Sequence, residues 1–422
     1  MKTFFSTLYA VAILLLVAGC SATPETHELS SGAWRGEFAV NNDTRIPFTF
    51  VVRDSAGHAN VFLTNGAEKA PLDSVYYKGD SVVIAINLFD AVLTGKITGD
   101  SLHGYFRKNQ AARQGLAFHA VRAKQPRFAV NDSTNAKAVR GRWSVTLTSE
   151  RDGKSTSRYT VGLLEQRGHK VTGTILSTTG DYRYLEGVID GNQLKLSAFS
   201  GSSPALLQAE LTDSITLRGE YITPGGKTIV QAIKSDTAAL PDAYSLTHLK
   251  AGSEKLSFTF PDLDGKPVSL ADSKYKDKVV IVTILGSWCP NCIDEAAFLA
   301  PWFKENKNRG VEIVGLAFER KDDPAFAKAR LGNLIKRFDI QYDILFAGVS
   351  DKKVVAEKLP ELASFISFPT TFFIDKAGKV RKVHTGYNGP ATGEYYDAFI
   401  REFNGEVDAL INEASPGVTA AL

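Results

Sequence analysis

The sequence predicts a multidomain protein with an all-β N-terminal region and a C-terminal α/β domain. From about residue 32 to residue 233, short runs of alternating apolar and polar residues recur, as in 48–52 and 193–197, with turn residues such as Asn65-Gly66 between them. After residue 252, nearly continuous apolar runs alternate with helix-like stretches, which indicates a buried parallel sheet. A Cys-x-x-Cys pair, Cys289 and Cys292, stands between one such run and the next helix.

The N-terminus indicates export. Lys2 is followed by an apolar run over residues 8–18, which is too short for a permanent membrane helix of about 20 residues. The end of this run, Leu16-Val17-Ala18-Gly19-Cys20, resembles a bacterial lipobox, in which the cysteine is lipidated and becomes the mature N-terminus. The alternative is an ordinary signal peptide with an incidental cysteine. We therefore expect a protein of the bacterial cell envelope, anchored by lipid at Cys20 and facing the periplasm.

Composition excludes several classes of protein. The chain of 422 residues has 3 cysteines, so once Cys20 is lipidated no framework of structural disulfides is possible. The net charge of +3 is small for this length and argues against nucleic acid as a partner. No cofactor is expected.

The β region has the pattern of a tandem repeat. Three landmarks occur twice in the same order, and each copy of roughly a hundred residues is long enough for a small antiparallel barrel or sandwich. The glycine-x-tryptophan start is reminiscent of lipocalin-like barrels that carry a ligand. The alternative is a filled β domain that binds proteins or acts as a spacer. The paired landmarks are 32–34 with 141–143, 78–82 with 190–194, and 100–106 with 213–221.

The C-terminal region contains a strand–helix–strand unit of parallel strands. Residues 279–285 form an apolar strand, a helix is expected from about 292 to 306, and residues 311–318 form a second apolar strand. A hairpin around Asp264-Gly265 precedes this unit. Further elements are expected at 323–338 (helix), 370–375 and 379–385 (hairpin) and about 391–404 (helix).

These observations divide the chain into seven segments. The expected segments are 1–20 (signal peptide), 21–30 (tether), 31–125 (first β repeat), 138–233 (second β repeat), 234–252 (linker), 253–410 (redox domain) and 411–422 (C-terminal tail).

The segment from about residue 253 to 410 resembles the TlpA/ResA-like thiol–disulfide oxidoreductases, which have a thioredoxin fold. The resemblance rests on Trp288-Cys289-Pro290-Asn291-Cys292, the preceding hairpin, the helical insertion, and Phe-Pro-Thr-Thr-Phe-Phe-Ile-Asp at 368–375. Two positions depart from the pattern. Thr283 stands where thioredoxin has a buried acid, and Ala297 stands where the family usually has a proline.

The position of the two cysteines indicates their chemistry. At a strand-to-helix junction, the unpaired N–H groups and the helix dipole favour a thiolate on Cys289, which would attack a partner disulfide. Cys292, one turn further on, would resolve the mixed disulfide, and Pro290 restricts the backbone between them.

The resemblance implies roles for other residues. Glu295 matches a glutamate that assists proton transfer, although a helix N-terminal glutamate favoured by the dipole is the alternative. Pro369 matches the cis-proline that lies against the cysteines, the alternative being an ordinary trans proline. The residues expected to contact the substrate are Trp288, Pro290, Phe368, Pro369 and Thr370.

The predicted function is exchange of disulfides with partner proteins in the envelope, with reduction favoured over oxidation and an unidentified electron donor. A zinc half-site is disfavoured because zinc needs four ligands, and no further cysteines are available. A peroxiredoxin-like peroxidase would need threonine three residues before Cys289, where Gly286 stands. A lipoprotein that binds a ligand or protein, with an accessory redox domain, is the third alternative.

Overall fold

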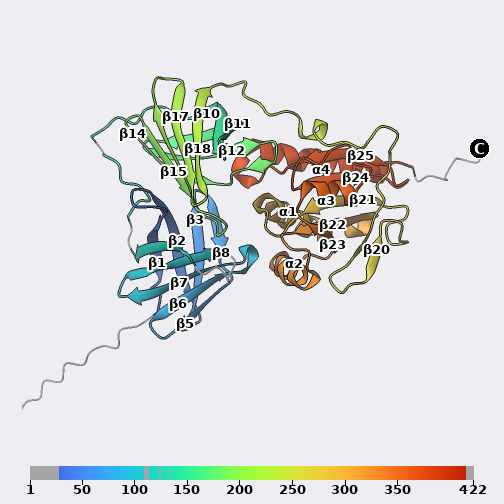
Figure 1. Ribbon diagram of the computed structural model, residues 1–422, viewed down its shortest axis with the longest axis horizontal. Coiled ribbons are helices and arrows are strands. Elements are labelled where there is room, and N and C mark those ends of the chain that lie inside the picture. The colour runs from blue at the N-terminus through green and yellow to red at the C-terminus, as the bar shows by residue number, and fades with distance from the viewer. Residues whose placement is uncertain (1–27, 109–113, 123–124, 132, 415–422) are drawn as a thin grey trace, which may run out of the picture.

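The computed structural model describes residues 28–108, 114–122, 125–131 and 133–414. Two β units lie side by side at one end of the molecule, and an α/β unit packs against both of them (Figure 1). Cys20 and the expected signal peptide lie outside the described residues. Among the helices of the described residues, none is long and apolar enough to cross a membrane.

The first β unit is a nine-stranded antiparallel sheet. Alternate residues of its strands are buried, and an aromatic core forms where Phe38 stacks on Phe48, with ring centroids 4.4 Å apart. The sheet order is β4-β3-β2-β1-β9-β8-β7-β6-β5, and it curls so that β3 and β5 come into contact. The strands are β1 (Gly32–Ala39), β2 (Arg45–Ser55), β3 (His58–Asn65), β4 (Glu68–Pro71), β5 (Ser74–Lys78), β6 (Ser81–Ile86), β7 (Ala91–Thr98), β8 (Ser101–Lys108) and β9 (Leu116–Arg122), with a 3₁₀ turn η1 (Asn87–Phe89).

The second β unit is also a nine-stranded antiparallel sheet, and an additional pairing of β11 with β12 closes it into a barrel. Its interior is filled: the cavity among the core side chains has a volume of about 30 Å³, room for no more than a water molecule. This packing favours the filled β domain over the ligand-carrying barrel. The strands are β10 (Gly141–Arg151), β11 (Lys154–Arg167), β12 (Lys170–Ser177), β13 (Gly180–Asp181), β14 (Leu185–Asp190), β15 (Gln193–Ala198), β16 (Ala205–Leu211), β17 (Thr216–Thr223) and β18 (Gly226–Lys234).

The two β units share one local arrangement. Trp34 and Trp143 lie in the first strand of their units, both almost fully buried. The indole of Trp34 donates to the carbonyl of Ser30 at 2.9 Å, and that of Trp143 donates to the carbonyl of Val139 at the same distance. In each unit the first strand pairs with both the second and the last strand. That the units are copies of one repeat stays a prediction.

The α/β unit is built on a five-stranded sheet with the order β23-β22-β21-β24-β25. β21, β22 and β23 are parallel, and β24 runs antiparallel to β21. Helices α1, α2 and α4 cover one face, whereas α3 and the β19–β20 hairpin cover the other, which explains why the central strands are apolar throughout. The elements are β19 (Thr259–Pro261), β20 (Pro267–Ser269), β21 (Val279–Leu285), α1 (Pro290–Asn306), β22 (Val311–Glu319), α2 (Pro324–Phe338), β23 (Asp343–Val349), α3 (Lys352–Lys358), β24 (Thr370–Ile374), β25 (Val380–Thr385) and α4 (Glu394–Asn412).

Some element bounds differ from the sequence prediction. Helix α1 begins at Pro290 rather than at residue 292, because Cys289 caps it. Helix α4 continues to Asn412 rather than ending at 404, because Val407 and Leu410 extend its buried stripe; its last residues therefore reach into the expected tail. β23 and α3 had no predicted counterpart.

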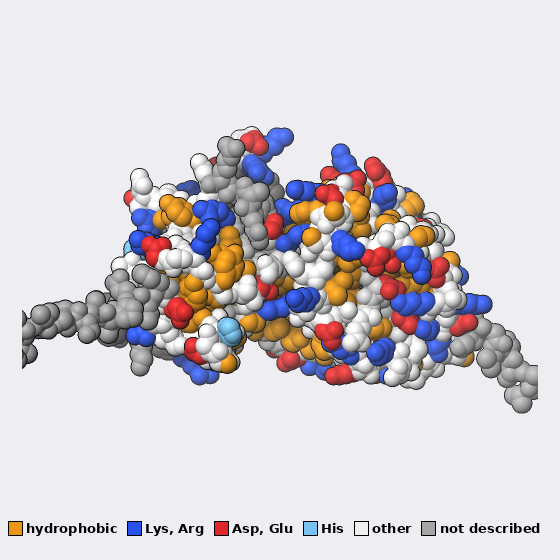
Figure 2. All heavy atoms as spheres, turned by 90° about the horizontal axis from the view of Figure 1, so that it is seen from below, with side chains coloured by type: hydrophobic (Ala, Val, Ile, Leu, Met, Phe, Trp, Pro, Cys, Tyr) orange, Lys and Arg blue, Asp and Glu red, His pale blue; other side chains and the backbone are white. Residues whose placement is uncertain are grey.

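The surface of the α/β unit carries mixed charges, whereas its junction with the β units is largely apolar. Lys, Arg, Asp and Glu side chains are interspersed over the face of the α/β unit shown in Figure 2, in keeping with the small net charge. A single apolar cluster, however, runs from the first β unit into the α/β unit and includes Phe89, Phe199 and Ile293. At the same junction Arg330 of α2 donates to the carbonyls of Asn87 and Leu88, both at 2.9 Å.

Arg127 joins the two β units. Its side chain is almost fully buried and donates to Asn65 Oδ1 at 3.1 Å and to the carbonyl of Ser197 at 2.8 Å. It also faces Glu186 at 3.6 Å. Burial lowers the pKa of Arg127 to about 10, so the residue stays charged at neutral pH.

Arg127→Met should lower the free energy of unfolding by about 3 kcal/mol, because buried acceptors left without a donor cost about 1–3 kcal/mol each. Arg140→Met is the control, since Arg140 pairs with Glu165 where both side chains are mostly exposed, and it should change stability little. Urea unfolding followed by tryptophan fluorescence measures both. Equal midpoints for the two variants would contradict the role given to Arg127.

Candidate active site

Cys289 caps the N-terminus of helix α1. Strand β21 ends at Leu285, and a short turn leads to Cys289, whose extended backbone precedes Pro290 at the first helical position. The Sγ atom of Cys289 accepts a hydrogen bond from the backbone N–H of Cys292 at 3.3 Å. Both cysteines are free thiols in this structure. The sulfur thus satisfies one of the backbone N–H groups that a helix N-terminus leaves without a partner.

The two sulfurs differ in their surroundings. Cys289 is 6% exposed and Cys292 is 1% exposed. Burial, followed by the hydrogen bond with Cys289, raises the pKa of the Cys292 thiol well above its usual value. Cys292 is therefore held as a thiol inside the protein, whereas Cys289 is the more exposed of the two sulfurs.

The cis peptide bond expected at Pro369 is present, between Phe368 and Pro369. The Sγ atom of Cys289 lies 3.6 Å from the carbonyl oxygen of Phe368. Thr370 differs from the other residues expected to contact a substrate. It is fully buried, pairs within the sheet on both sides, and donates its hydroxyl to the carbonyl of Ser367 at 2.7 Å. Its side chain therefore faces inward.

Trp288 is held in place on the rim. Its indole N–H donates to the carbonyl of Phe318 at 2.9 Å, and its ring meets Phe368 edge to face at 5.2 Å. The Arg320 guanidinium lies over the indole, 5.0 Å from the ring centroid. Trp288 and Phe368 are half-buried, so they offer apolar surface next to Cys289.

Glu295 is buried beneath the cysteines between two threonine hydroxyls. Thr283 donates to one carboxylate oxygen at 2.6 Å and Thr371 donates to the other at 2.7 Å. Burial raises the pKa of Glu295 to about 7, although both hydroxyls act in the opposite direction. Thr283 occupies the strand position where thioredoxin has an acid, and here it holds a carboxylate supplied by the helix. Thr371 lies within the 368–375 motif, but no role was predicted for it.

A second buried charge cluster next to the cysteines escaped sequence analysis. Arg183, from the barrel, lies 2.8 Å from Asp294 of α1 and 2.6 Å from Glu68 of the first β unit. Burial raises the pKa of Asp294 to about 7, while Arg183 acts against it. The three residues come from three different units, so no local sequence pattern marks the cluster.

His384, at the end of β25, is buried. Its Nδ1 atom is 3.0 Å from the carbonyl oxygen of Gly386. Burial lowers the pKa of His384 to about 4, so the ring is neutral at physiological pH. Within the described residues, no group of His, Cys, Asp and Glu side chains is arranged to hold a metal ion.

The α/β unit is similar to known redox proteins. Residues 251–383 match the family described as AhpC/TSA. The thiol-disulfide oxidoreductase ResA of Bacillus thuringiensis subsp. konkukian (strain 97-27) is 32% identical over 132 residues, which is 31% of this chain and 68% of that protein. The ResA of Bacillus subtilis (strain 168) is 30% identical over 138 residues, or 33% of this chain and 69% of that protein.

The chain belongs to the ResA family. It is a thiol–disulfide oxidoreductase of thioredoxin fold, as the resemblance of residues 253–410 indicated. A solved thiol:disulfide interchange protein of the thioredoxin family from Chlorobium tepidum TLS is 26% identical and covers 38% of this chain and 97% of its own, with a TM-score of 0.29. A thiol-disulfide oxidoreductase from Bacteroides fragilis NCTC 9343 is 19% identical over 36% of this chain and 99% of its own, with a TM-score of 0.27.

The ResA relatives align with about a third of this chain.

The peroxidase alternative gains no support from the site. The position three residues before Cys289 is Gly286, which has no hydroxyl. A Cβ atom there would lie 2.3 Å from the indole nitrogen of Trp288, so a threonine does not fit while the tryptophan keeps its place.

The raised pKa of Glu295 predicts a pH-dependent contribution to stability. A carboxyl group whose pKa is higher in the folded than in the unfolded state contributes fully below its unfolded value and loses that contribution as pH rises through the folded value. Since the folded value is about 7, the contribution should fall by about 3 kcal/mol between pH 4.5 and 7.

Glu295→Gln removes this titration. Relative to the wild type, the variant should become more stable as pH rises over that window and show no further change above it. Urea unfolding of both proteins at a series of pH values measures the difference. If the two stability curves run parallel through pH 4.5–7, Glu295 does not titrate as described.

Proposed function

We propose that Cys289 is the attacking thiol of this oxidoreductase and Cys292 the resolving thiol, and that the pair reduces disulfides of partner proteins in the cell envelope. The observation that carries the assignment is the unequal placement of the sulfurs: Cys289 accepts the helix N–H at the opening, and Cys292 is buried with a raised pKa. Trp288, Pro290, Phe368 and Pro369 would border the partner segment.

The proposed reaction has two exchange steps. The Cys289 thiolate attacks one sulfur of a partner disulfide, forming a mixed disulfide and releasing the other partner sulfur as a thiolate, which takes up a proton. Cys292 then loses its proton and attacks the Cys289 sulfur, which closes a Cys289–Cys292 disulfide and releases the second partner thiol. The partner gains two electrons and the cysteine pair loses two. A dithiol electron donor must restore the pair.

Glu295 supplies the proton acceptor in this proposal. Its charge is close enough to Cys292 to raise the pKa of that thiol, and its own pKa of about 7 suits a group that exchanges protons at neutral pH. As Cys292 becomes a nucleophile, a neighbouring carboxylate that takes its proton avoids two negative charges in a buried space.

The remaining parts of the chain are assigned from sequence. Lipid on Cys20 would tether the mature protein to the membrane, with residues 21–30 as the spacer. The domain limits stay as proposed above, and the two β units, related as repeats, would position the redox unit and recruit partners. The filled barrel interior gives no support to a ligand-carrying role.

Cysteine variants test the central assignment. Cys289→Ser should lose reduction of a model protein disulfide, whereas Cys292→Ala should keep the first attack and accumulate mixed disulfides that mass spectrometry can identify. Glu295→Gln, which leaves both sulfurs in place, should slow the resolving step by about 10²–10⁴-fold, the usual contribution of general acid–base catalysis. Turnover by Cys289→Ser, or faster alkylation of Cys292 than of Cys289, would reverse the roles.

The lipid anchor is tested separately. Cys20→Ala should abolish metabolic labelling with a fatty acid and release the protein from the membrane fraction, because no other lipid attachment is proposed. Cys292→Ala serves as a control for loss of a cysteine and should stay labelled. Unchanged labelling of Cys20→Ala would show that the lipobox assignment is wrong.

A further inference from the structure

A turn of the β-barrel touches the residue between the two cysteines. The turn comprises residues 178–180, from the end of β12 to the first residue of β13, and is called the barrel turn here. Asn291 Nδ2 donates to the carbonyl of Thr179 at 3.1 Å. Gly180 lies so close that a Cβ atom would come 2.1 Å from Asn291 Nδ2 and 2.6 Å from the carbonyl oxygen of Tyr387. The barrel therefore contacts the Cys-Pro-Asn-Cys segment directly.

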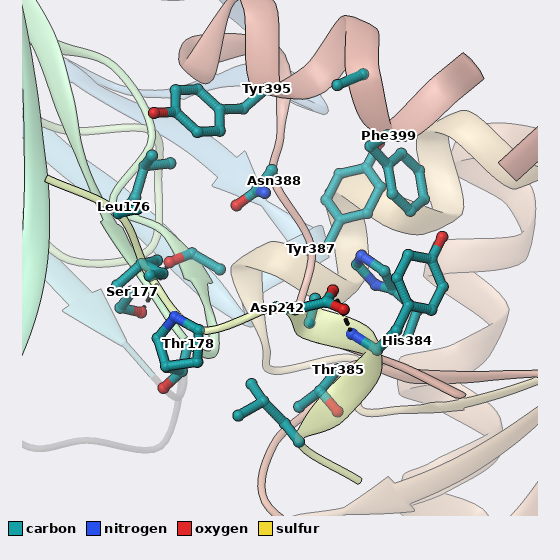
Figure 3. Close-up of a pocket in the computed structure, with 18 of the residues that line it drawn as sticks. Leu176, Ser177, Thr178, Asp242, His384, Thr385, Tyr387, Asn388, Tyr395 and Phe399 are labelled. Carbon is teal, nitrogen blue, oxygen red and sulfur yellow. Dashed lines mark hydrogen bonds between the residues drawn. The ribbon is translucent and has the colours of Figure 1, made fainter. Parts of the chain in front are cut away.

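The barrel turn also contacts the loop on the other side of the cis-proline. The N–H of Gly386 donates to the carbonyl of Pro369 at 2.9 Å. A Cβ atom on Gly386 would lie 2.9 Å from the carbonyl oxygen of Thr178. Figure 3 shows this junction, with Ser177 and Thr178 of the barrel on one side of the pocket and Thr385 and Tyr387 on the other. The turn thus fills the space between the helix N-terminus and the cis-proline loop.

Buried polar contacts fix the barrel turn in this position. Asp181 accepts the N–H of Gly389 at 2.8 Å, and Arg183 forms its ion pairs with Asp294 and Glu68. Breaking a buried ion pair is costly, because one charge is left without a partner. The contact with Asn291 therefore lies beside buried polar contacts between the same two units.

The first β unit also contacts residues next to Cys289. Phe89 and Asp90 of the first β unit line a space of only about 20 Å³ beside Trp288 and Glu319. Both β units therefore contact residues next to Cys289 in the chain, and the cysteine itself is 6% exposed. So small an exposed area gives a broad, folded protein surface little to contact.

We infer that the barrel turn is a specificity-determining wall of the redox site, which restricts Cys289 to disulfides carried on an extended, unfolded polypeptide segment and keeps away disulfides set in a folded surface. The inference rests on the proposed role of Cys289 as the attacking thiol. An extended segment passes between the wall and the Trp288–Phe368 rim, where main-chain groups and apolar side chains are available to it.

The wall is tested by displacing the turn with Gly180→Ala. The added methyl group has no room beside Asn291, and the φ of +123° at Gly180 disfavours any side chain. Gly226→Ala is the matched control, because Gly226 lies in another barrel turn with a φ of +134° and has nothing within 4 Å of its Cβ position. Backbone strain is therefore similar in the two variants, and only the contact with the redox site differs.

The readout is the size dependence of Cys289 alkylation in the reduced full-length chain. Rates for iodoacetamide and for a maleimide carrying a polyethylene glycol chain are measured by mass spectrometry of the Cys289 peptide. We call an arrangement open when the barrel turn has moved away from Asn291. If it is populated at a tenth or less in the wild type, Gly180→Ala should raise the alkylation rate of Cys289 with the large reagent by about tenfold or more. The rate with iodoacetamide should change much less. If Gly180→Ala and Gly226→Ala show the same ratio of the large-reagent rate to the iodoacetamide rate, the proposed wall is contradicted.

A second pair of variants approaches the same contact from the α/β unit. Gly386→Ala pushes against Thr178 and should give the same change in ratio, whereas Gly310→Ala, with the same φ of +80° and nothing within 4 Å, should not. If neither test variant folds, the wild type decides the question. The ratio of the large-reagent rate to the iodoacetamide rate at Cys289 is then compared between the folded and the urea-unfolded chain, and equal ratios would contradict the wall.

The alkylation readout separates the two proposals, because it does not depend on turnover. A protein with the expected size dependence that reduces no disulfide would contradict the proposed function and leave the wall standing. Reduction of an unfolded and a folded disulfide-bonded protein at equal rates by the wild type would contradict the wall and leave the proposed function standing.

Discussion

The hydrogen bond from the N–H of Cys292 to the sulfur of Cys289 is the interaction on which the redox site depends. It makes the Cys289 sulfur the cap of α1, so the atom that we propose to attack the partner disulfide also ends the strand-to-helix connection. Because helix geometry places Cys292 one turn further into the interior, it is the more deeply buried of the two thiols, with no charged residue between them. The chemistry of the pair thus follows from where a helix starts.

The buried carboxyl group beneath the cysteines comes from helix α1, through Glu295, and not from strand β21. The strand position that carries an acid in thioredoxin is Thr283 here, and its hydroxyl holds the carboxylate that α1 provides. Thr371 on the neighbouring strand completes the site. Two neutral donors stabilise the ionised form less than a positive charge would, which is why burial prevails and the pKa stays near neutrality.

The parts of the structure that depend on short stretches of sequence could be predicted. Apolar strands, the hairpin around Asp264-Gly265 and the Cys-x-x-Cys junction each leave a local pattern, and all three are present in the α/β unit. β23 and α3 were missed because the apolar run of the strand is brief and the helix has only 7 residues. Closure of the barrel by β11 and β12 leaves no local signal, since alternation is the same in an open sheet and in a closed one.

The polar contacts around the cysteines could not be predicted, because they join residues far apart in the chain. Glu68, Arg183 and Asp294 meet only after three units have packed together, and each alone reads as an ordinary surface charge. Thr371 gains its role only once β24 lies beside β21. Thr370, which sequence placed with the partner-contacting residues, is turned inward by the same alternation that brings Thr371 to Glu295.

The contact of Asn291 with the barrel has a consequence for how this chain can change over evolutionary time. In a redox domain that stands alone, the two residues between the cysteines are free to vary with the reactivity that the pair requires. Here Asn291 also bonds to Thr179 of the barrel, and only a glycine at position 180 leaves room for its side chain. Substitutions at position 291 are therefore constrained by residues more than a hundred positions away in the barrel. The redox motif and the barrel turn can change only together.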